Sequence, residues 1–409
     1  MFVLMTKIKL GIAFFSFFLL NNCSSQNNTV IPQQQTINNK QQTNIITGAE
    51  RLDILLPLIK DKRVALLVNQ TSMVSSSHLV DTLLTYKINI KRIFAPEHGF
   101  RGSADAGEHV RDSVDAKTKI KIISLYGDKK KPSAEDLKDV DVMIFDIQDV
   151  GARFYTFISS LHYLMEACAD NNKQLIVLDR PNPNGWYIDG PVLKKEFQSF
   201  VGVDPIPVVH GLTVGEYAQM VNGEKWLPNA TQCNLKVIEC LNYNRTMHYS
   251  LPVKPSPNLP NDMAVYNYAS ICYFEGTDIS VGRGTDYPFQ MIGAPQITVR
   301  NFSFTPQSKL GAKNPPHINQ VCFGWDLRRV NTSKGEINLS YLLKTYATFP
   351  DTVKYFLANG FFDKLAGTDE LRKQIITGKS ETEIKASWKN GLDEYKKMRK
   401  KYLLYKDFE

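Results

Sequence analysis

Apolar runs alternate with amphipathic stretches over the first half of the chain. Runs rich in branched and aromatic residues, typical of strands buried in a parallel sheet, occupy 63–68, 88–95, 119–125, 142–145 and 174–178. Helical periodicity covers 51–60, 78–86, 135–138 and 154–171. Strands and helices that alternate in this order predict a Rossmann-like, doubly wound parallel sheet of the α/β class.

Polar clusters follow most of these apolar runs. The central run is followed by Asp146, Gln148, Asp149, Gly151 and Arg153. The other clusters are Asn69-Gln70-Thr71, Pro96-Glu97-His98-Gly99, Tyr126-Gly127 and Asp179-Arg180-Pro181-Asn182-Pro183. In open α/β sheets, ligands bind beyond the carboxyl ends of the strands, so the clusters together predict a binding site. For any single cluster, a helix cap with a solvated turn is the alternative interpretation.

The regular alternation of predicted strands and helices ends after residue 185. Thr213 and Glu216 have the spacing of a capping box at the start of a helix. Loop-rich sequence begins at Leu251, helical periodicity returns at Tyr341, and a long charged helix is expected over 381–402. We therefore predict a Rossmann-like domain over 48–245 and a smaller α+β auxiliary domain over 246–409.

The first residues resemble a targeting signal. Lys7 and Lys9 precede an apolar segment over 10–20, which is too short to span a bilayer comfortably, and Cys23 follows it closely. This order predicts a lipoprotein signal peptide over 1–22, lipidation at Cys23 and a disordered tether rich in Gln and Asn over 23–47. The location expected is the periplasm or cell envelope; simple secretion after cleavage nearby is the alternative.

Composition and charge narrow the class of protein. The chain has 409 residues, is 43% hydrophobic and 22% charged, and carries a net charge of +8, which is typical of a globular protein. The basic run over 396–401 is better explained as a solvated helix face than as a nucleic-acid site. Five cysteines remain after Cys23, an odd number. Either Cys233 and Cys240 form a local disulfide or all five are buried as small hydrophobic residues.

Several common catalytic signatures are missing from the sequence. It contains no P-loop, no G-x-G-x-x-G after the first strand, no G-x-S-x-G and no H-E-x-x-H, so neither a cofactor nor a metal is expected. Carboxylates at strand ends suit glycoside hydrolysis, in which one acid protonates the leaving oxygen and a second group acts on water or on the developing charge.

Glu97 is the best placed general acid. It follows an apolar strand and a proline, and desolvation at such a rim favours the protonated form that an acid needs. Two alternatives remain. Glu97 could merely pair with Arg101, or Glu97-His98 could bind a metal together with Glu108-His109.

Arginines in glycine-flanked turns suit an acidic sugar. Guanidinium groups bind carboxylates through two parallel hydrogen bonds, and Arg153 and Arg283 both lie where the backbone can approach a ligand. Tyr155 could stack on a sugar ring, although aromatic residues are more often part of the core. His210 is either a structural histidine or a ligand contact.

The motifs resemble those of a known family, the NamZ exo-β-N-acetylmuramidases. The stretches that carry the resemblance, in order along nearly the whole chain from about residue 48, are Asn69-Gln70-Thr71, PEHGFRG (96–102), AGE (106–108), SLYG (124–127), FDIQDVGARFYT (145–156), DRPNP (179–183), HGLTVGE (210–216), PSPNLP (255–260) and FEGTDISVGRGTDYPF (274–289).

The resemblance implies a Rossmann-like domain, a smaller second domain and an active site between them. It implies release of β-1,4-linked N-acetylmuramic acid from the non-reducing end of peptidoglycan fragments. On the matching motifs, Glu97 would be the general acid, with Asp146 or Asp149 as the second carboxylate. Arg153 and Arg283 would bind the lactyl carboxylate. The remaining residues expected to contact substrate are His98, Arg101, Gln148, Tyr155, Asn182, His210 and Glu275.

Two other kinds of protein fit the same sequence. A non-catalytic lipoprotein that binds muropeptides would use the same arginines and aromatic residues but would not need Glu97. A metal-dependent hydrolase on this sheet is the third interpretation, and it predicts loss of activity with a chelator.

Overall fold

The computed structural model describes residues 44–100, 112–330, 332 and 334–409, and in these residues the central sheet has seven strands. The strands of the whole described chain are β1 Arg63–Val68, β2 Met73–Val74, β3 Ser77–His78, β4 Asn89–Ala95, β5 Ser113–Val114, β6 Lys121–Ser124, β7 Val142–Asp146, β8 Gln174–Leu178, β9 Asn234–Ile238, β10 Met291–Ala294, β11 Ser303–Phe304 and β12 Cys322–Asp326.

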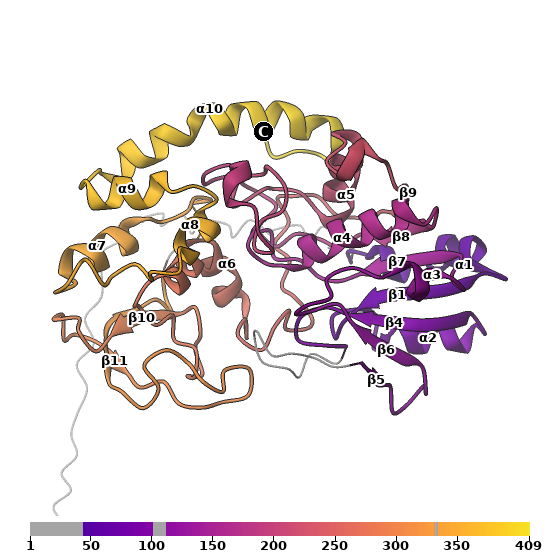
Figure 1. Ribbon diagram of the computed structural model, residues 1–409, viewed down its shortest axis with the longest axis horizontal. Helices are drawn as coiled ribbons and strands as arrows, with labels where there is room; N and C mark the ends of the chain where they lie inside the picture. The colour runs from indigo at the N-terminus through magenta and orange to yellow at the C-terminus, as the bar shows by residue number, and fades with distance from the viewer. Residues whose placement is uncertain (1–43, 101–111, 331, 333) are drawn as a thin grey trace, which may run out of the picture. The chain divides into compact units, whose positions relative to one another are not determined.

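The helices complete the inventory of elements (Figure 1). The α-helices are α1 Leu52–Ile59, α2 Leu79–Thr85, α3 Ala134–Leu137, α4 Phe157–Asp170, α5 Val214–Gly223, α6 Asp262–Ile271, α7 Ser340–Thr348, α8 Phe361–Ala366, α9 Glu370–Ile376 and α10 Glu381–Arg399. The short 3-10 helices are η1 Gly48–Glu50, η2 Lys195–Phe197, η3 Pro228–Ala230, η4 Cys272–Gly276 and η5 Lys400–Tyr402.

The order of strands across the central sheet is β5-β6-β4-β1-β7-β8-β9. Every neighbouring pair is parallel except β5 with β6. Leaving out β5, the chain builds outward from β1 first in one direction and then in the other, which is the doubly wound order of the Rossmann fold. The fold class predicted from the sequence is confirmed.

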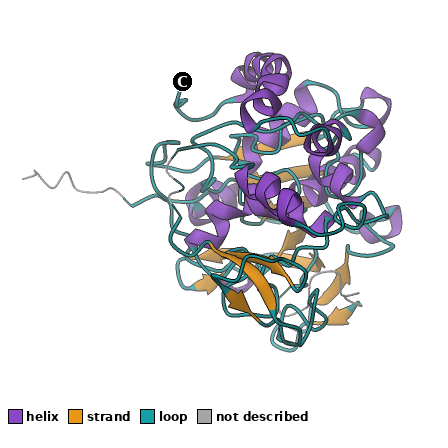
Figure 2. Ribbon diagram, turned by 90° about the vertical axis from the view of Figure 1, so that its left-hand side faces the viewer, coloured by secondary structure: helices purple, strands orange, loops and turns teal. Residues whose placement is uncertain are grey.

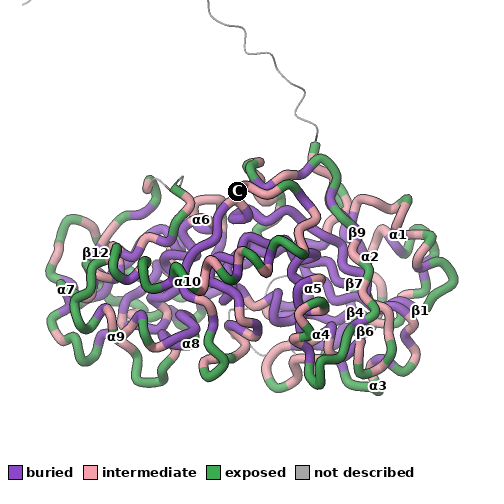
Figure 3. The backbone as a smooth tube through the Cα atoms, turned by 90° about the horizontal axis from the view of Figure 1, so that it is seen from above, coloured by how far each residue is buried: buried purple, intermediate pink, exposed green. Residues whose placement is uncertain are grey.

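Helices cover both faces of this sheet because side chains along a strand alternate in direction. In β1, Val64 and Leu66 pack in the core that also holds α1 and α2, whereas Ala65 and Leu67 pack in the larger core with α4 and α5. Burial on both faces explains why these strands are apolar without interruption. Figure 3 shows the strands of the sheet buried between the layers.

The C-terminal half adds a small antiparallel sheet and helices. The strand order is β10-β12-β11, and long loops join the elements, as Figure 2 shows. Helix α10 then runs back toward α5 (Figure 1), where Tyr395 donates a hydrogen bond to the carbonyl of His210. Residues 44–409 form one compact unit.

Several elements were not predicted from the sequence, among them strand β9 and helix α6. Strand β9 lies at the edge of the sheet, where its first four residues are partly or fully exposed, so it carries no continuous apolar run. Helix α6 is buried on nearly every side and therefore lacks an amphipathic period. Its start is nevertheless encoded locally, because the Asn261 side chain accepts a hydrogen bond from the backbone N–H of Ala264.

The five cysteines after Cys23 are all reduced and buried: Cys168, Cys233, Cys240, Cys272 and Cys322. The structure therefore has no disulfide between Cys233 and Cys240. All five cysteines are buried as small hydrophobic residues, the second of the two predicted alternatives. In the described part of the chain, no helix is both long and apolar enough to cross a membrane.

Candidate active site

A pocket of about 1030 Å³ opens beyond the carboxyl ends of β4 and β6. One wall comes from the loops that follow these strands and from the start of α4. The opposite wall comes from residues between Ser256 and Phe289, and from the loop around Pro315. The pocket therefore lies between the sheet and the C-terminal half of the chain, at the edge where the strand-end clusters predicted a site.

Glu97 lies on the sheet side of this pocket and is half-buried. Its Oε2 accepts a hydrogen bond of 2.9 Å from the hydroxyl of Thr156, the residue that precedes α4. The next residue, His98, also lines the pocket and has a backbone φ of 67°, and Gly99 has a φ of 76°. Left-handed φ values are rare outside glycine, so this sharp turn at a strand end is a strained feature of the kind found at functional sites.

Tyr155 lies between the two walls and is buried. Its ring packs edge-on against Phe157 and Tyr268, at centroid distances of 4.8 and 5.8 Å. Burial raises the pKa of the Tyr155 phenol well above its ordinary value, and the charges of Asp149 and Glu97 raise it further. Tyr155 is therefore a neutral hydroxyl at any physiological pH, able to donate a hydrogen bond inside the pocket.

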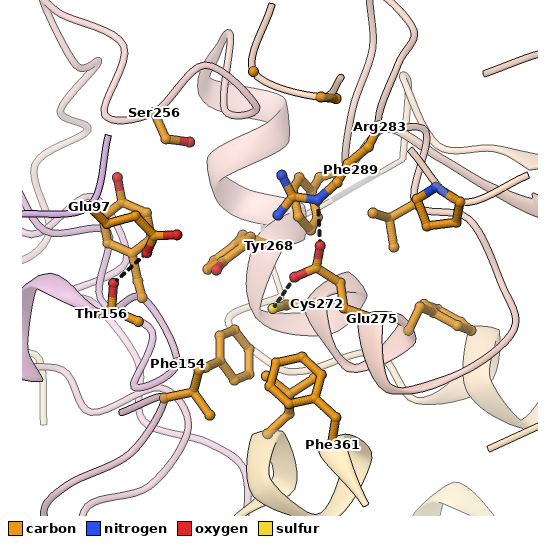
Figure 4. A pocket seen from close by; sticks show the side chains of 18 of the residues that line it. Glu97, Phe154, Thr156, Ser256, Tyr268, Cys272, Glu275, Arg283, Phe289 and Phe361 are labelled. Carbon is orange, nitrogen blue, oxygen red and sulfur yellow. Dashed lines mark hydrogen bonds and ion pairs between the residues drawn. The ribbon is translucent and has the colours of Figure 1, made fainter. Parts of the chain in front are cut away.

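Arg283 lies on the opposite wall, where Glu275 holds it. The Nε of Arg283 donates to Oε1 of Glu275, and its guanidinium lies 5.1 Å from the ring centroid of Phe289. Burial opposes the charge, but the Glu275 carboxylate raises the pKa of Arg283 above its ordinary value. Figure 4 shows the terminal nitrogens of Arg283 turned toward the wall that carries Glu97, with Tyr268 between them.

Other residues of the predicted site lie beneath the pocket wall. Asp146 is fully buried in an ion pair with Arg180, whose Nε and Nη2 donate to the two carboxylate oxygens at 2.6 and 2.9 Å. A carboxylate that is closed off in this way cannot reach a substrate, so Asp146 as the second catalytic acid is corrected to a structural partner of Arg180.

Arg153 is also buried, and it binds backbone rather than substrate. Its Nη1 donates to the carbonyls of Pro191 and Ile206, and its Nη2 donates to the carbonyls of Leu365 and Ala366 at the end of α8. Burial lowers the pKa of Arg153 to about 10, which leaves it charged at neutral pH. The expectation of a lactyl-binding Arg153 is therefore corrected: it caps the C-terminus of α8, where carbonyls are left unpaired and the helix dipole is negative.

Four further residues expected at the ligand form a buried polar layer behind Tyr155: Gln148, Asp149, Asn182 and His210. Asp149 accepts from the backbone N–H of Gly151 at 2.6 Å, and its other contact is Nε2 of His210 at 3.6 Å. Asn182 donates to the carbonyl of Leu212 at 2.8 Å. None of these residues lines the pocket in the structure, and their expected contact with substrate stays a prediction.

The structure thus brings five predicted residues together on the pocket: Glu97, His98, Tyr155, Glu275 and Arg283. The predicted positions Cys23 and Arg101 lie outside the described residues, as do Glu108 and His109 of the alternative metal cluster. Among the described residues, no group of three His, Cys, Asp or Glu side chains is arranged to hold a metal ion.

Several pocket residues were not singled out as site residues from the sequence. Thr156 and Tyr126 belong to motifs quoted above, FYT and SLYG, so a signal for them existed. Lys130 and Phe200 also line the pocket. They stand outside every motif, and only the folding of two distant loops toward the same wall reveals them.

Comparison with known proteins gives a consistent picture over both halves of the chain. Residues 64–263 match the family model described as the N-terminal part of the exo-β-N-acetylmuramidase NamZ, and residues 266–405 match the model of its C-terminal part. The chain is 40% identical over 388 residues to the peptidoglycan β-N-acetylmuramidase NamZ of Bacillus subtilis strain 168, covering 87% of this chain and 90% of the relative.

Solved structures with the same fold come from Bacteroides fragilis NCTC 9343. One DUF1343 family protein has a TM-score of 0.83 and 48% identity, over 89% of this chain and 100% of that chain. A second has a TM-score of 0.77 and 30% identity, over 88% of this chain and 99% of that chain.

Proposed function

Because this chain belongs to the NamZ family of exo-β-N-acetylmuramidases, we propose that its pocket binds the terminal N-acetylmuramic acid of a peptidoglycan fragment and releases it. The chain is a glycoside hydrolase of peptidoglycan turnover. What the pocket adds is an assignment of roles to particular side chains.

The observation that carries this assignment is the pairing of an acid on one wall with an arginine on the other. Glu97 lies on the sheet side, fixed by Thr156, and Arg283 lies on the C-terminal side, fixed by Glu275 (Figure 4). N-acetylmuramic acid differs from N-acetylglucosamine by a lactyl ether with a carboxylate. A guanidinium held across the pocket from the acid supplies the partner which that carboxylate needs.

Glu97 acts as general acid in this assignment. It gives its proton to the glycosidic oxygen as the bond from that oxygen to C1 of the muramic acid breaks. Water then bonds through its oxygen to C1, and the proton that it gives up restores the acid form of Glu97, so the products are free N-acetylmuramic acid and a saccharide shortened by one sugar.

Glu275 is a positioning residue in this assignment. Its carboxylate occupies the Nε side of Arg283 and thereby leaves the two terminal nitrogens for the ligand. A second acid on this wall, Asp278, is engaged with Gln296 at 3.1 Å and lies 3.5 Å from Nε2 of His317. Glu97 is therefore the pocket carboxylate that we assign to proton transfer.

The test uses the chain from Ser24 onward with two chromogenic β-glycosides, one of N-acetylmuramic acid and one of N-acetylglucosamine. We expect release only from the first, and we expect Glu97→Gln to lose at least about a hundredfold in kcat. Glu239→Gln, which changes an exposed acid away from the pocket, is the matched control.

Each other outcome would point elsewhere. Release from the glucosamine substrate would contradict recognition of the lactyl group by Arg283. Activity that survives Glu97→Gln would move the proton donor to another acid. Binding of muropeptides without release from either substrate would favour the non-catalytic lipoprotein.

We also propose that the protein is anchored in the cell envelope through a lipid on Cys23. Support comes from Lys7 and Lys9, the apolar segment that follows them and the polar tether after Cys23. Growth with a labelled fatty acid should mark the wild-type protein but not Cys23→Ala. Equal labelling of both, or of neither, would contradict the proposal.

A further inference from the structure

The pocket is larger than one sugar requires. Pockets that enclose whole drug-sized ligands span about 300–1000 Å³, and this one reaches about 1030 Å³. If Glu97 and Arg283 define the place of the muramic acid, part of the pocket is left for whatever is attached to it. The leaving group occupies the part of the pocket next to Glu97, because a general acid lies beside the leaving oxygen.

Strand register places a tyrosine next to that acid. Ala95 at the end of β4 pairs with Ser124 at the end of β6, and the backbone N–H of Leu125 donates to the carbonyl of Ala95 at 2.8 Å. Glu97 and Tyr126 each lie two residues beyond this pair, so they leave the same edge of the sheet side by side. Both line the pocket.

Aromatic rings continue outward from this position. The ring of Phe200 lies 6.1 Å from that of Tyr126, and Tyr163 stacks on Phe200 at 6.1 Å with an interplanar angle of 15°. Tyr126 and Phe200 are pocket residues and are half-buried, whereas Tyr163 supports Phe200 from outside the pocket. Apolar ring surface of this kind binds the C–H face of a pyranose.

Three consecutive lysines, 129–131, lie in the loop after Tyr126, and one of them lines the pocket. Lys129 pairs with Asp136, and Lys131 pairs with Glu166 and with Asp170. Lys130 lines the pocket, and its ammonium group lies 4.8 Å from the ring centroid of Phe200. No ion pair with an acid is found for it in the described part of the chain. Its charge is therefore available to an anionic group that enters beside Phe200.

We propose that Tyr126 and Phe200 form the subsite for the sugar that leaves, and that Lys130 favours a leaving saccharide that carries a carboxylate farther along. The proposal rests on the function assigned above, since it takes Glu97 as the acid. In a fragment of alternating sugars, the group released from the first muramic acid begins with a neutral N-acetylglucosamine. The next sugar again carries a lactyl carboxylate, within the range of a lysine on the outer rim.

The first test separates the leaving sugar from the muramic acid. Two substrates are compared: the disaccharide of N-acetylmuramic acid linked to N-acetylglucosamine, and N-acetylmuramic acid with β-fluoride, which fills only the muramic acid position. For Phe200→Ala, we expect the ratio of kcat/KM on the disaccharide to kcat/KM on the fluoride to fall about tenfold. Phe200→Leu, which keeps the bulk but loses the ring, should lower the ratio in the same direction and guards against misfolding of the alanine variant.

The control for this test is Tyr86→Ala, an exposed aromatic residue away from the pocket, which should leave the ratio unchanged. A ratio within twofold of wild type in both Phe200 variants would overturn the subsite. Failure of wild type to hydrolyse either substrate would instead contradict the function itself, so the two failures are distinguishable.

The second test concerns Lys130. Wild type should prefer a trisaccharide that ends in a second, reduced muramic acid over the disaccharide, and added salt should weaken this preference. Lys130→Gln should abolish the preference, whereas Lys129→Gln, which removes the same charge one residue away and outside the pocket, should keep it. Equal loss in both variants would mean that net charge alone attracts the substrate, and no loss in Lys130→Gln would overturn its role.

Discussion

Arg153 and Arg283 differ in what their guanidinium groups contact. Arg153 gives both terminal nitrogens to backbone carbonyls from two distant parts of the chain, and its own side chain is among the largest that are fully buried. Arg283 uses Nε for Glu275 and presents its terminal nitrogens to the pocket. One arginine is thus part of the fold, and the other is available to a ligand.

Replacing each of them by methionine should separate these roles. Arg153→Met removes a donor from four buried carbonyls, of which that of Ile206 keeps the N–H of Leu193, and should lower the free energy of unfolding by roughly 3 kcal/mol or more. Arg283→Met should cost less stability but lower kcat/KM on muramic acid substrates roughly 10–100-fold, the value of a charge-assisted hydrogen bond. Urea unfolding and steady-state kinetics measure the two effects.

Arg300→Met, an exposed substitution in the C-terminal half, is the control: it loses a cation–π contact with Phe323 and should change stability by about 1 kcal/mol or less. The distinction would be wrong if Arg153→Met unfolded like wild type but no longer discriminated between muramic acid and glucosamine substrates. In that case Arg153 would have to reach the ligand after a rearrangement.

The sequence could not distinguish these arginines because both lie in glycine-flanked turns, where the backbone can approach a ligand. The carbonyls that Arg153 binds include those of Leu365 and Ala366, more than two hundred positions farther along the chain. Gly367, which follows these two residues, is the position in the local sequence that this contact restricts. It has a φ of 75°, and a Cβ there would lie 2.6 Å from Nη2 of Arg153. Without the fold, nothing connects that glycine with Arg153.

At the scale of elements, the C-terminal segment after α10 is held to the Rossmann-like part by charged groups that are buried. Arg399, at the last turn of α10, binds both carboxylate oxygens of Asp407 at 2.9 Å and the carbonyl of Gly211 at 3.0 Å. Arg245 donates to the same carbonyl at 2.7 Å and pairs with Glu216 in α5. The backbone N–H of Leu404 also donates to Glu216, at 2.8 Å.

This arrangement predicts that an ion pair of the last residues stabilises the fold strongly when it is buried and weakly when it is exposed. Asp407→Ala leaves the Arg399 guanidinium, which is 0% exposed, without its carboxylate and should cost roughly 3 kcal/mol in the free energy of unfolding. Glu409→Gln removes an ion pair with Lys396 that is about one third exposed, and should cost less than about 1 kcal/mol.

Chemical denaturation of the two variants beside wild type is the measurement. Equal and small losses would show that the segment after α10 contributes little to stability, and that Arg399 finds water or another acceptor when Asp407 is absent.

Local sequence predicted most strands of the central sheet because β1, β7 and β8 are buried on both faces and are therefore apolar along most of their length. The capping box of α5 was also predicted correctly, since Thr213 and Glu216 exchange the expected hydrogen bonds. Strand β9 and helix α6 escaped prediction for opposite reasons, partial exposure in one and nearly complete burial in the other. Periodicity reveals an element only when one side of it is buried and the other is not.

At the scale of the whole molecule, the chemistry of the site depends on parts of the chain that meet only in the fold. Glu97 stood at a predicted strand end and Tyr155 at the start of the helix predicted after the central strand, so their place at the edge of the sheet followed from the alternating pattern. Glu275 and Arg283 lie in a loop-rich region without periodicity; the glycines beside Arg283 pointed to it, whereas the family resemblance brought Glu275 forward. Lys130 and Phe200 had neither signal. Asp146 suggested catalysis in the sequence but is buried in the structure, because Arg180, which follows the neighbouring strand β8, binds both of its carboxylate oxygens.

Asp179 joins three distant parts of the molecule. It follows β8, and its carbonyl accepts from the N–H of Gly48 at 2.8 Å. Its carboxyl group accepts from the N–H of Gly215 at 2.8 Å, in the first turn of α5, and from the hydroxyl of Tyr405 at 2.6 Å, close to the C-terminus. Burial raises the pKa of Asp179 to about 7, with a further contribution from the charge of Glu216, while the hydrogen bonds to Tyr405, Gly215 and Thr213 act in the opposite direction.

This raised pKa predicts a stability that falls as the pH rises. In the unfolded chain an aspartate titrates near 3.9, so between about pH 4 and pH 7 the folded state binds a proton that the unfolded state has lost. The stabilisation is complete below pH 4, decreases by up to about 1.4 kcal/mol per pH unit within the window and does not change further well above pH 7.

The variant Asp179→Asn cannot ionise at this position. The measurement is the free energy of unfolding of wild type minus that of the variant. This difference should decrease from roughly pH 4.5 to pH 7, the range in which Asp179 titrates, and then level off. Asp53→Asn, at an exposed position in α1, controls for the loss of one carboxylate. A difference that is flat over this range, or that rises with pH, would mean that the hydrogen bonds from Gly215, Thr213 and Tyr405 outweigh burial and keep Asp179 ionised. The junction of the first helix, α5 and the C-terminal segment would then be held by a charge, and acid rather than neutral pH would loosen it.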